Sequence, residues 1–192
     1  MGLLREHSVI PAVRSMKEFE QALACPQEVI FLLEGELIQL ESIVSSAKRA
    51  GKRIFLHLDM VRGIKEDEAS VHYLAKAIKV DGVISTRTSS LIHAKKHGLM
   101  AIQRGFLIDS HSVKTIINSA AHIKPDYIEI LPSYSHPQIG KIAKETGVDI
   151  ILGGFIDGLE DLPVLFGAGA IAVSTSKTGM WGHPPGKSVK QG

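Results

Sequence analysis

Cysteine is almost absent from this sequence of 192 residues, which contains Cys25 alone. One cysteine cannot form a disulfide within the chain, so a small disulfide-stapled module is excluded. An excess of one charge is also missing, because 22 basic and 20 acidic residues leave a formal net charge of +2. This balance excludes a strongly basic nucleic-acid coat, and any contact with nucleic acid must come from local patches.

Long hydrophobic runs are missing as well. No apolar stretch approaches the roughly 18 residues of a membrane span, and the first residues, MGLLREHSVIPAVR, carry charges where a signal peptide would be apolar. Hydrophobic residues nevertheless make up 44% of the chain, which excludes a disordered chain and suffices for a core. We therefore expect a soluble cytoplasmic protein with no membrane partner.

Short apolar runs alternate with segments of helical periodicity along the chain. The predicted strands cover residues 9–13, 29–33, 54–58, 82–85, 100–103, 127–131, 149–152 and 170–174. The predicted helices cover residues 15–23, 36–50, 66–79, 89–97, 112–122, 137–146 and 159–166. Strands that alternate with helices predict a parallel sheet, and eight of them at regular spacing predict an α/β fold, a closed (βα)8 barrel of the TIM type.

The predicted barrel is minimal, because this fold rarely occupies fewer than about 200 residues. After Ser174 the chain contains a Pro-Pro-Gly sequence that forbids a long helix. We predict one domain over residues 1–182, with a degraded or missing final helix, and a C-terminal tail over residues 183–192. The barrel wall left uncovered, with Met180 and Trp181 nearby, suggests burial against another subunit and hence a homo-oligomer.

Alternation along the strands predicts which side chains face the barrel interior. On the third strand, Phe55, His57 and Asp59 share the inward face, and Asp59 follows at the carboxyl end, where the active sites of barrels lie. The polar residues expected around that rim are Arg14, Glu34, His57, Asp59, Arg87, Gln103, Arg104 and Glu129. A buried pair between Glu129 and an arginine that merely fills the barrel stays open as an alternative.

The last two predicted strands run into loops suited to phosphate. Gly153 and Gly154 follow the seventh strand, and Ser174, Thr175 and Ser176 follow the eighth. TIM barrels frequently bind phosphate with these two loops, because glycine lets backbone N–H groups approach an anion and hydroxyls add donors. Ordinary turns are the plain alternative, but the coincidence of both features favours a phosphate site.

The sequence contains few of the motifs that metal binding or covalent catalysis requires. The nine histidines are scattered along the chain and no cysteine cluster accompanies them, so we expect no metal site of the zinc type. A weak carboxylate site for Mg²⁺ at Glu34 and Asp59 stays open. A nucleophile elbow is missing, and lysine is missing from the inward strand positions that a Schiff-base enzyme needs. We therefore predict no catalytic residues and no cofactor.

Seven motifs in these segments resemble, in order, those of the glycerol uptake operon antiterminator regulatory family. They are IPAVR, HLDMVRGIKEDE, DGVISTR, AIQRGFLID, PDYIEILP, GGFI and AVSTS, which cover the chain from about Ile10 to Trp181. Singly, GG and STS occur in many phosphate-binding barrels, whereas the ordered set is specific. The resemblance implies a regulator that responds to glycerol 3-phosphate, binds leader mRNA of glycerol-utilisation genes and lets transcription pass a terminator.

The resemblance also implies three groups of binding residues. The residues that would hold the phosphate are Gly153, Gly154, Ser174 and Thr175. Those around the glycerol end would be Arg14, Asp59, Arg87 and Gln103, with His57 and Glu129 behind them. Leader mRNA would contact a basic group made of Arg87, Lys95, Lys96 and Arg104. That group carries no interleaved aromatic residues, so it does not indicate a protein that binds single-stranded RNA by stacking on its bases. Basic groups of this kind more commonly form a solvent-exposed surface without a partner.

An enzyme is the second hypothesis that stays open. TIM barrels host many reactions, so the fold alone does not exclude a phosphate-binding barrel that acts on a small phosphorylated substrate. Asp59 or Glu129 would then be the base, and its carboxyl would need a shifted pKa.

Overall fold

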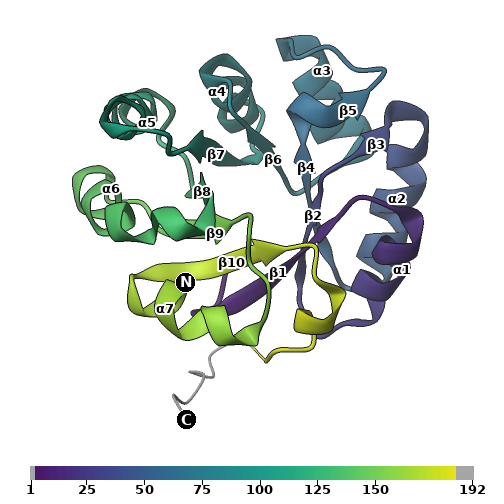
Figure 1. Cartoon of the computed structure of the whole chain (residues 1–192). Coiled ribbons are helices and arrows are strands. Elements are labelled where there is room, and N and C mark those ends of the chain that lie inside the picture. The colour runs from purple at the N-terminus through teal and green to yellow at the C-terminus, as the bar shows by residue number, and fades with distance from the viewer. Residues whose placement is uncertain (1–2, 185–192) are drawn as a thin grey trace.

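A closed barrel of parallel strands forms the centre of the protein. The computed structural model describes residues 3–184, and within that range eight strands pair in the order β1–β2–β4–β6–β7–β8–β9–β10, with β10 returning to β1 (Figure 1). The barrel strands are β1 (Ser8–Val13), β2 (Val29–Leu32), β4 (Arg53–His57), β6 (Gly82–Ser85), β7 (Met100–Phe106), β8 (Tyr127–Leu131), β9 (Ile150–Gly153) and β10 (Ala170–Thr175). The predicted (βα)8 barrel is therefore confirmed.

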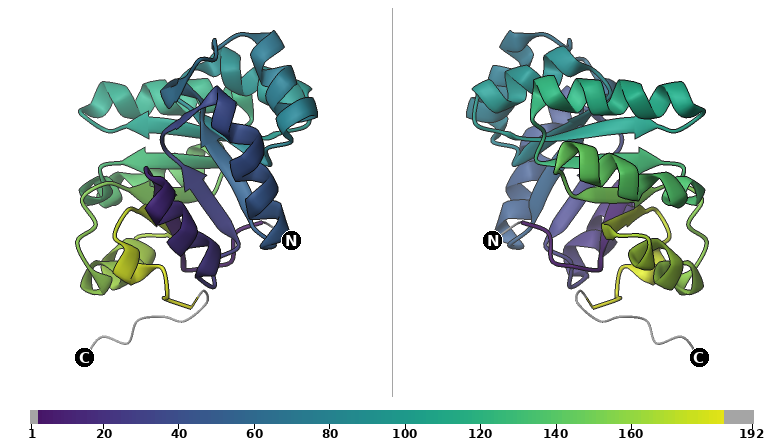
Figure 2. Two further views of the ribbon diagram at one scale, coloured as in Figure 1. Left: turned by 90° about the vertical axis from the view of Figure 1, so that its right-hand side faces the viewer. Right: turned by 90° about the vertical axis from the view of Figure 1, so that its left-hand side faces the viewer.

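Helices cover the outside of the strands, as the side views show (Figure 2). They are α1 (Met16–Ala24), α2 (Leu37–Arg49), α3 (Glu68–Tyr73), α4 (Thr88–Lys96), α5 (Ser110–Ile123), α6 (Ile139–Thr146) and α7 (Leu162–Gly167). Helix α3 continues into a π-helical turn over Leu74–Ile78. Two short strands outside the barrel, β3 (Gly35–Glu36) and β5 (Val61–Arg62), pair with each other in the loops that follow β2 and β4.

Alternation divides the apolar side chains into two layers. Phe55 and Tyr127 belong to the cluster inside the barrel, whereas Leu56 and Ile128 pack in the layer between strands and helices. The inward direction predicted for Phe55 is therefore confirmed. The N–H of Leu4, which is buried in the inner cluster, donates to the Tyr127 hydroxyl at 3.2 Å. The chain before β1 thus covers the amino end of the barrel.

Strand β7 is longer than the sequence predicts, since it runs to Phe106 rather than ending at residue 103. Gly105 lies where α5 packs directly on the strand: a Cβ there would be 2.5 Å from Cδ1 of Ile116. Because the strand continues past residue 103, its side chains keep alternating between the inside and the outside of the barrel. Arg104 points into the barrel, and Gln103 points outward, with its Nε2 donating to the Ile116 carbonyl at 3.1 Å.

In the described residues after β10, which end at residue 184, a 3₁₀ turn over Thr178–Met180 takes the place of an eighth helix. The prediction of a degraded final helix is confirmed. Trp181 is buried next to this turn; its Nε1 donates to the Thr175 carbonyl at 2.9 Å, and its own carbonyl accepts from Gln27 Nε2 at 3.2 Å. The indole therefore covers the part of the barrel wall that the missing helix leaves open.

The burial of Met180 and Trp181 corrects the expectation of an exposed apolar patch at this wall, because both side chains pack within their own chain. The homo-oligomer that the patch suggested stays a prediction without that support. The predicted tail over residues 183–192 falls, apart from its first two residues, outside the described residues. Within residues 3–184, none of the helices is both long and apolar enough to cross a bilayer.

Trp181→Ala should lower the free energy of unfolding by about 3–5 kcal/mol, because it removes a large buried ring that has no helix behind it. Trp181→Phe should cost only about 1 kcal/mol, which corresponds to the lost hydrogen bond to Thr175. Urea denaturation followed by circular dichroism measures both. Ile38→Ala, at a residue that is 87% exposed, is the control; a loss for Trp181→Ala as small as that of the control would contradict this role.

Candidate ligand-binding site at the carboxyl end of the barrel

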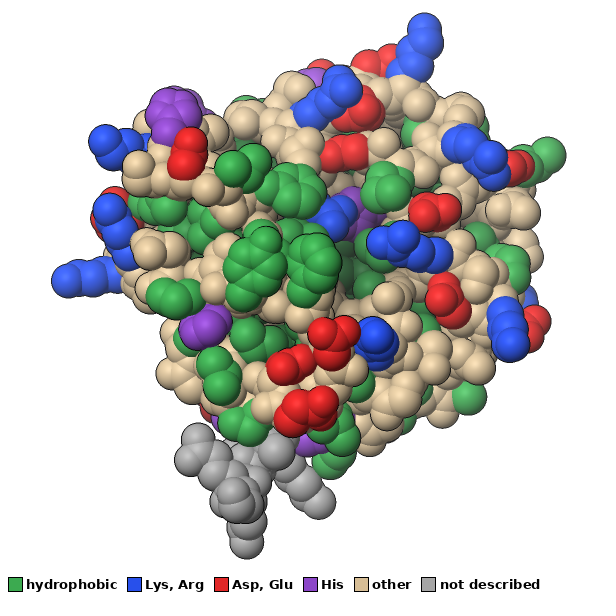
Figure 3. All heavy atoms as spheres, viewed as in Figure 1, with side chains coloured by type: hydrophobic (Ala, Val, Ile, Leu, Met, Phe, Trp, Pro, Cys, Tyr) green, Lys and Arg blue, Asp and Glu red, His purple; other side chains and the backbone are tan. Residues whose placement is uncertain are grey.

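The carboxyl ends of the strands surround a cavity of about 280 Å³. Figure 3 looks down on this end and shows a hollow near the barrel axis with basic and histidine side chains inside it. The walls come from β1, β2, β7, β8 and the loops after β9 and β10. The lining residues are Ala12, Arg14, Leu33, Arg104, Glu129, Leu131, Gly154, Phe155, Ile156, Asp157, Ser174, Thr175, Ser176 and Lys177.

A charged cluster forms the floor of the cavity. Glu129 on β8 is only 2% exposed, and its Oε1 accepts from the Ser174 hydroxyl at 2.6 Å. Its Oε2 lies 3.5 Å from Nε of Arg104 and 3.7 Å from Nε2 of His57. Arg104 Nη1 in turn lies 2.9 Å from His57 Nε2. One carboxylate thus connects side chains from β4, β7 and β10.

The charge of Glu129 is held by its neighbours. Burial raises the pKa of this carboxyl, but the hydrogen bond and charge of His57, the charge of Arg104 and the Ser174 hydroxyl outweigh burial and hold the pKa below 4.5. The carboxylate is therefore ionised at neutral pH. Glu129 Oε2 and Arg104 Nε have no hydrogen-bond partner among the described residues. They lie 3.5 Å from each other as an ion pair without hydrogen-bond geometry.

Residues of the loops after β9 and β10 line the cavity, and three of them have backbone N–H groups without an acceptor in the described chain. Gly154 and Phe155 both have positive φ angles, +76° and +53°, which turn the chain sharply over the cavity. The N–H groups of Phe155, Ile156 and Ser176 donate to no acceptor within residues 3–184. Gly153 lies directly behind, where a Cβ would be 2.5 Å from Ser174 Oγ. Clustered free N–H groups of this kind bind anions.

The structure brings together only part of the residue set expected from the sequence. Arg14, Gly154, Ser174 and Thr175 line the cavity, with Gly153, His57 and Glu129 beside or beneath it. Gln103 does not line it, because the longer β7 turns this side chain toward α5. We therefore leave Gln103 out of the ligand set.

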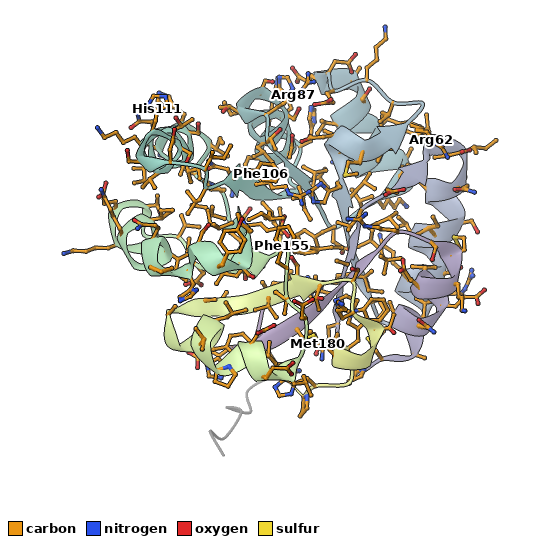
Figure 4. The ribbon with its side chains drawn as sticks, in the orientation of Figure 1. Arg62, Arg87, Phe106, His111, Phe155 and Met180 are labelled. Atoms are coloured by element: carbon orange, nitrogen blue, oxygen red, sulfur yellow. The ribbon has the colours of Figure 1, made fainter. Side chains whose placement is uncertain are left out.

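Arg87 and Asp59 are also placed away from the cavity. Arg87 extends to Glu66, with 2.7 Å between Nε and Oε2, and Figure 4 shows it well outside the barrel mouth. The Asp59 carboxylate accepts from the Ser85 hydroxyl and from the N–H and hydroxyl of Thr86. It thereby fixes the loop after β6. Both residues are left out of the ligand set for these reasons.

The open alternative of a Mg²⁺ site finds no geometric support. Glu34 lies 4.0 Å from Nη1 of Arg14, in a neighbouring groove, and the Asp59 oxygens are engaged as described. Within the described part of the chain, no group of three or more His, Cys, Asp or Glu side chains is placed to hold a metal ion.

The four basic residues expected to bind RNA do not form one face. Lys95 and Lys96 lie at the last turn of α4, at the amino end of the barrel, where they pair with Asp126 at 2.8 Å and Glu68 at 2.6 Å. Arg104 lies in the cavity at the opposite end. Lys95 and Lys96 are paired with carboxylates, and Arg104 lies at the other end of the barrel. These residues therefore form no continuous basic surface.

Sequence reasoning missed the aromatic residues at the mouth. Figure 4 shows Phe155 close to the barrel axis and Phe106 beside it. Phe155 directly follows the Gly153-Gly154 pair, and Phe106 follows Arg104 and Gly105. The available signal was the position of these rings immediately after glycines at predicted strand ends. Exposed rings beside a ligand cavity are atypical of a surface that is only solvated.

The fold and the cavity define the class of protein, a TIM-type barrel with a charged pocket at its carboxyl end. A family model described as glycerol-3-phosphate responsive antiterminator matches residues 9–181. This protein therefore belongs to the glycerol-3-phosphate responsive antiterminator family.

Similar proteins agree with this assignment. The uncharacterized protein YgcP of Escherichia coli (strain K12) is 34% identical over 181 residues, which cover 94% of this chain and 95% of YgcP. A glycerol uptake operon antiterminator regulatory protein from Listeria monocytogenes superposes with a TM-score of 0.88 at 35% identity, covering 92% of this chain and 96% of the other. An antiterminator-related protein from Thermotoga maritima gives a TM-score of 0.81 at 27% identity, with 92% and 98% covered.

Glu129→Gln should lower the free energy of unfolding at neutral pH by about 1–3 kcal/mol, because Arg104 loses its charged partner. The folded-state pKa of Glu129 is depressed, so its contribution is complete above 4.5 and is lost as pH falls through the lower folded-state pKa. The difference between wild type and variant should therefore narrow below pH 4.5. Chemical denaturation across this pH range measures the difference.

Glu145→Gln on the exposed face of α6 is the matched control for that series. A difference between wild type and Glu129→Gln that stays constant from neutral pH to below 4.5 would contradict the depressed pKa.

Proposed function

We propose that this protein is a transcription antiterminator that binds glycerol 3-phosphate as its effector and contacts the leader mRNA of glycerol-utilisation genes. The family supports this function, and the cavity at the carboxyl end of the barrel is the observation that carries the effector part. Such a regulator acts where transcription takes place, so we propose a cytoplasmic location. No cofactor is required, because binding alone is the event that is sensed.

The cavity offers a matching group for each part of glycerol 3-phosphate. The phosphate fits against the free N–H groups of Phe155, Ile156 and Ser176, with the positive charges of Arg14 and Lys177 at the edge. The apolar side chains of Ala12, Leu33 and Leu131 provide contact for the carbon chain. Gly154, Ser174 and Thr175 from the predicted phosphate set line the same cavity, and Arg14, which the sequence predicts at the glycerol end, is assigned here to the phosphate.

Hydroxyl groups of the ligand would meet the floor of the cavity. Glu129 Oε2 can accept from a hydroxyl, and Arg104 Nε can donate to one, since neither atom makes a hydrogen bond within the described chain beyond their ion pair at 3.5 Å. A ligand without hydroxyls would leave both atoms buried and unpaired. The site should therefore prefer a phosphorylated polyol to phosphate alone.

The lowered pKa of Glu129 and the exposed position of Lys177 favour a binding protein over an enzyme. A general base works best with a pKa near the operating pH, whereas the neighbours of Glu129 hold its pKa below 4.5. Lys177 at the cavity edge is exposed, and its Nζ lies 3.5 Å from the Asp157 carboxylate. It therefore lacks the desolvated environment that activates a Schiff-base lysine.

Glycerol 3-phosphate should bind and remain intact. Phosphorus NMR of the purified protein with this compound should show a broadened ligand resonance and no new resonance over hours, with inorganic phosphate as the reference for non-specific binding. New phosphorus resonances would establish turnover and favour the enzyme hypothesis. Absence of broadening would contradict the effector assignment.

A glycine pair provides the matched control for the position of the site. Gly154→Ala should weaken glycerol 3-phosphate binding by about tenfold, because the strained left-handed position would relax and move the N–H donors. Gly140→Ala, in α6 with open space around its Cβ, should leave the affinity unchanged. Isothermal titration calorimetry measures both, and equal affinities for the two variants would place the ligand elsewhere.

A further inference from the structure

Four exposed apolar side chains gather beside the cavity on the loops that follow β7, β8 and β9. We call Phe106, Ile108, Tyr134 and Phe155 the mouth patch. Ile108 is 88%, Tyr134 67% and Phe155 77% exposed. The rings of Tyr134 and Phe155 lie 5.8 Å apart, although they come from different loops. Figure 3 shows hydrophobic side chains concentrated next to the hollow at this end of the barrel.

A groove continues the mouth patch away from the barrel axis. It has a volume of about 460 Å³ and runs between the loop after β7 and the segment after β8. Its lining includes Ile108, Val113, Tyr134, Gln138 and Lys141. Rings, aliphatic side chains and an amide thus form one continuous surface from the cavity to the groove.

We propose that the mouth patch and this groove bind the leader RNA as a single strand, with bases stacked on the exposed rings. This inference rests on the proposed function and names the surface that contacts RNA. Proteins that hold single-stranded nucleic acid combine exposed aromatic rings with cations that follow the phosphate backbone. The loops of an RNA leader present unstacked bases to such a surface.

Cations stand on both sides of the rings. The Arg104 guanidinium lies 5.2 Å from the centre of the Phe106 ring. Lys141 lines the groove, and its Nζ is 4.0 Å from the exposed Glu145, a weak pairing that an RNA phosphate can replace. Lys177 lies across the cavity. By contrast, Lys95 and Lys96 are paired at the other end of the barrel.

The nearby carboxylates are already engaged. Asp109 caps α5 by accepting from the Ser112 N–H at 2.8 Å, which holds the pKa of its carboxyl below the usual value. Asp157 faces Lys177 at 3.5 Å. Both carboxylates stay ionised, and Asp109 itself lines the groove, so the cations do not make this surface net positive. Stacking of bases on the exposed rings is therefore the contact that favours RNA here.

Two residues belong to both the cavity and the vicinity of the patch. Phe155 lines the cavity and contacts Tyr134, and Arg104 lines the cavity and contacts Phe106. A ligand in the cavity therefore touches residues that touch the RNA surface. The effector can change RNA affinity through these direct contacts if it stabilises one arrangement of the rings.

Photo-crosslinking tests where RNA lies. The probe is the 5′ leader transcript of glycerol-utilisation genes from the organism that encodes this chain, labelled with 4-thiouridine, with crosslinked peptides identified by mass spectrometry. Crosslinks should fall on peptides that contain Tyr134, Phe155 or residues 106–108. Crosslinks confined to the end of α4 around Lys95 and Lys96 would overturn the proposal.

A pair of tyrosine variants tests the energetic contribution. Tyr134→Ala should weaken binding of the same transcript by about 5- to 150-fold, the effect of losing one stacked base. Tyr73→Ala is the matched control, because Tyr73 is 47% exposed on α3, away from the mouth. RNA affinity equal to wild type in Tyr134→Ala would overturn the proposal.

The same measurements separate this inference from the proposed function. If wild type binds the transcript and Tyr134→Ala binds it equally well, the RNA surface is wrong and the antiterminator function stands. If wild type binds glycerol 3-phosphate but not the transcript, the RNA part of the proposed function fails together with this inference. A change of sedimentation in Tyr134→Ala without a change of RNA affinity would assign the mouth patch to contact between copies and overturn the proposal.

Discussion

The ionised carboxylate of Glu129, buried at the centre of the barrel, is the constraint on which the functional end of this protein depends. A charge in that position is tolerated only because His57, Arg104 and Ser174 come from three other strands to meet it. The same requirement fixes the directions of those side chains. Within the described residues it leaves one carboxylate oxygen and one guanidinium nitrogen in an ion pair without a hydrogen bond, at the base of the cavity. The pairing that stabilises the barrel thus also prepares a polar site.

The closing of the barrel elsewhere directs binding to this end. The chain before β1 packs against the inner cluster through Leu4, and Trp181 covers the wall where the final helix is missing. The loops after β9 and β10 are then the ones that turn inward, with Gly154 and Phe155 in left-handed conformations above the cavity. In the function we propose, the ligand binds at the same end at which the exposed rings lie. The ligand and the RNA could then affect each other's binding through direct contacts, without a long path of coupled residues between two distant sites.

Residue alternation predicts the fold well and the site only partly. Apolar runs of period two place Phe55 and Glu129 inside the barrel because both lie within uninterrupted strands. The prediction fails at β7, because Arg104 and Gly105 break the apolar run. A strand that ends at residue 103 places Gln103 on the rim, whereas β7 continues to Phe106. The prediction also fails for Met180 and Trp181, because a pattern cannot show that a ring folds back over its own strand. Burial of that kind depends on contacts between segments far apart in the sequence, such as Gln27 with Trp181.

The central claim is that one ligand and one RNA are bound by the same barrel end and influence each other. The most direct test is the dissociation constant of the leader transcript, measured by fluorescence anisotropy with and without saturating glycerol 3-phosphate. We predict a change of roughly 5- to 150-fold, with the reciprocal change in glycerol 3-phosphate affinity when RNA is saturating. Equal RNA affinity in the presence and absence of the ligand would contradict the account.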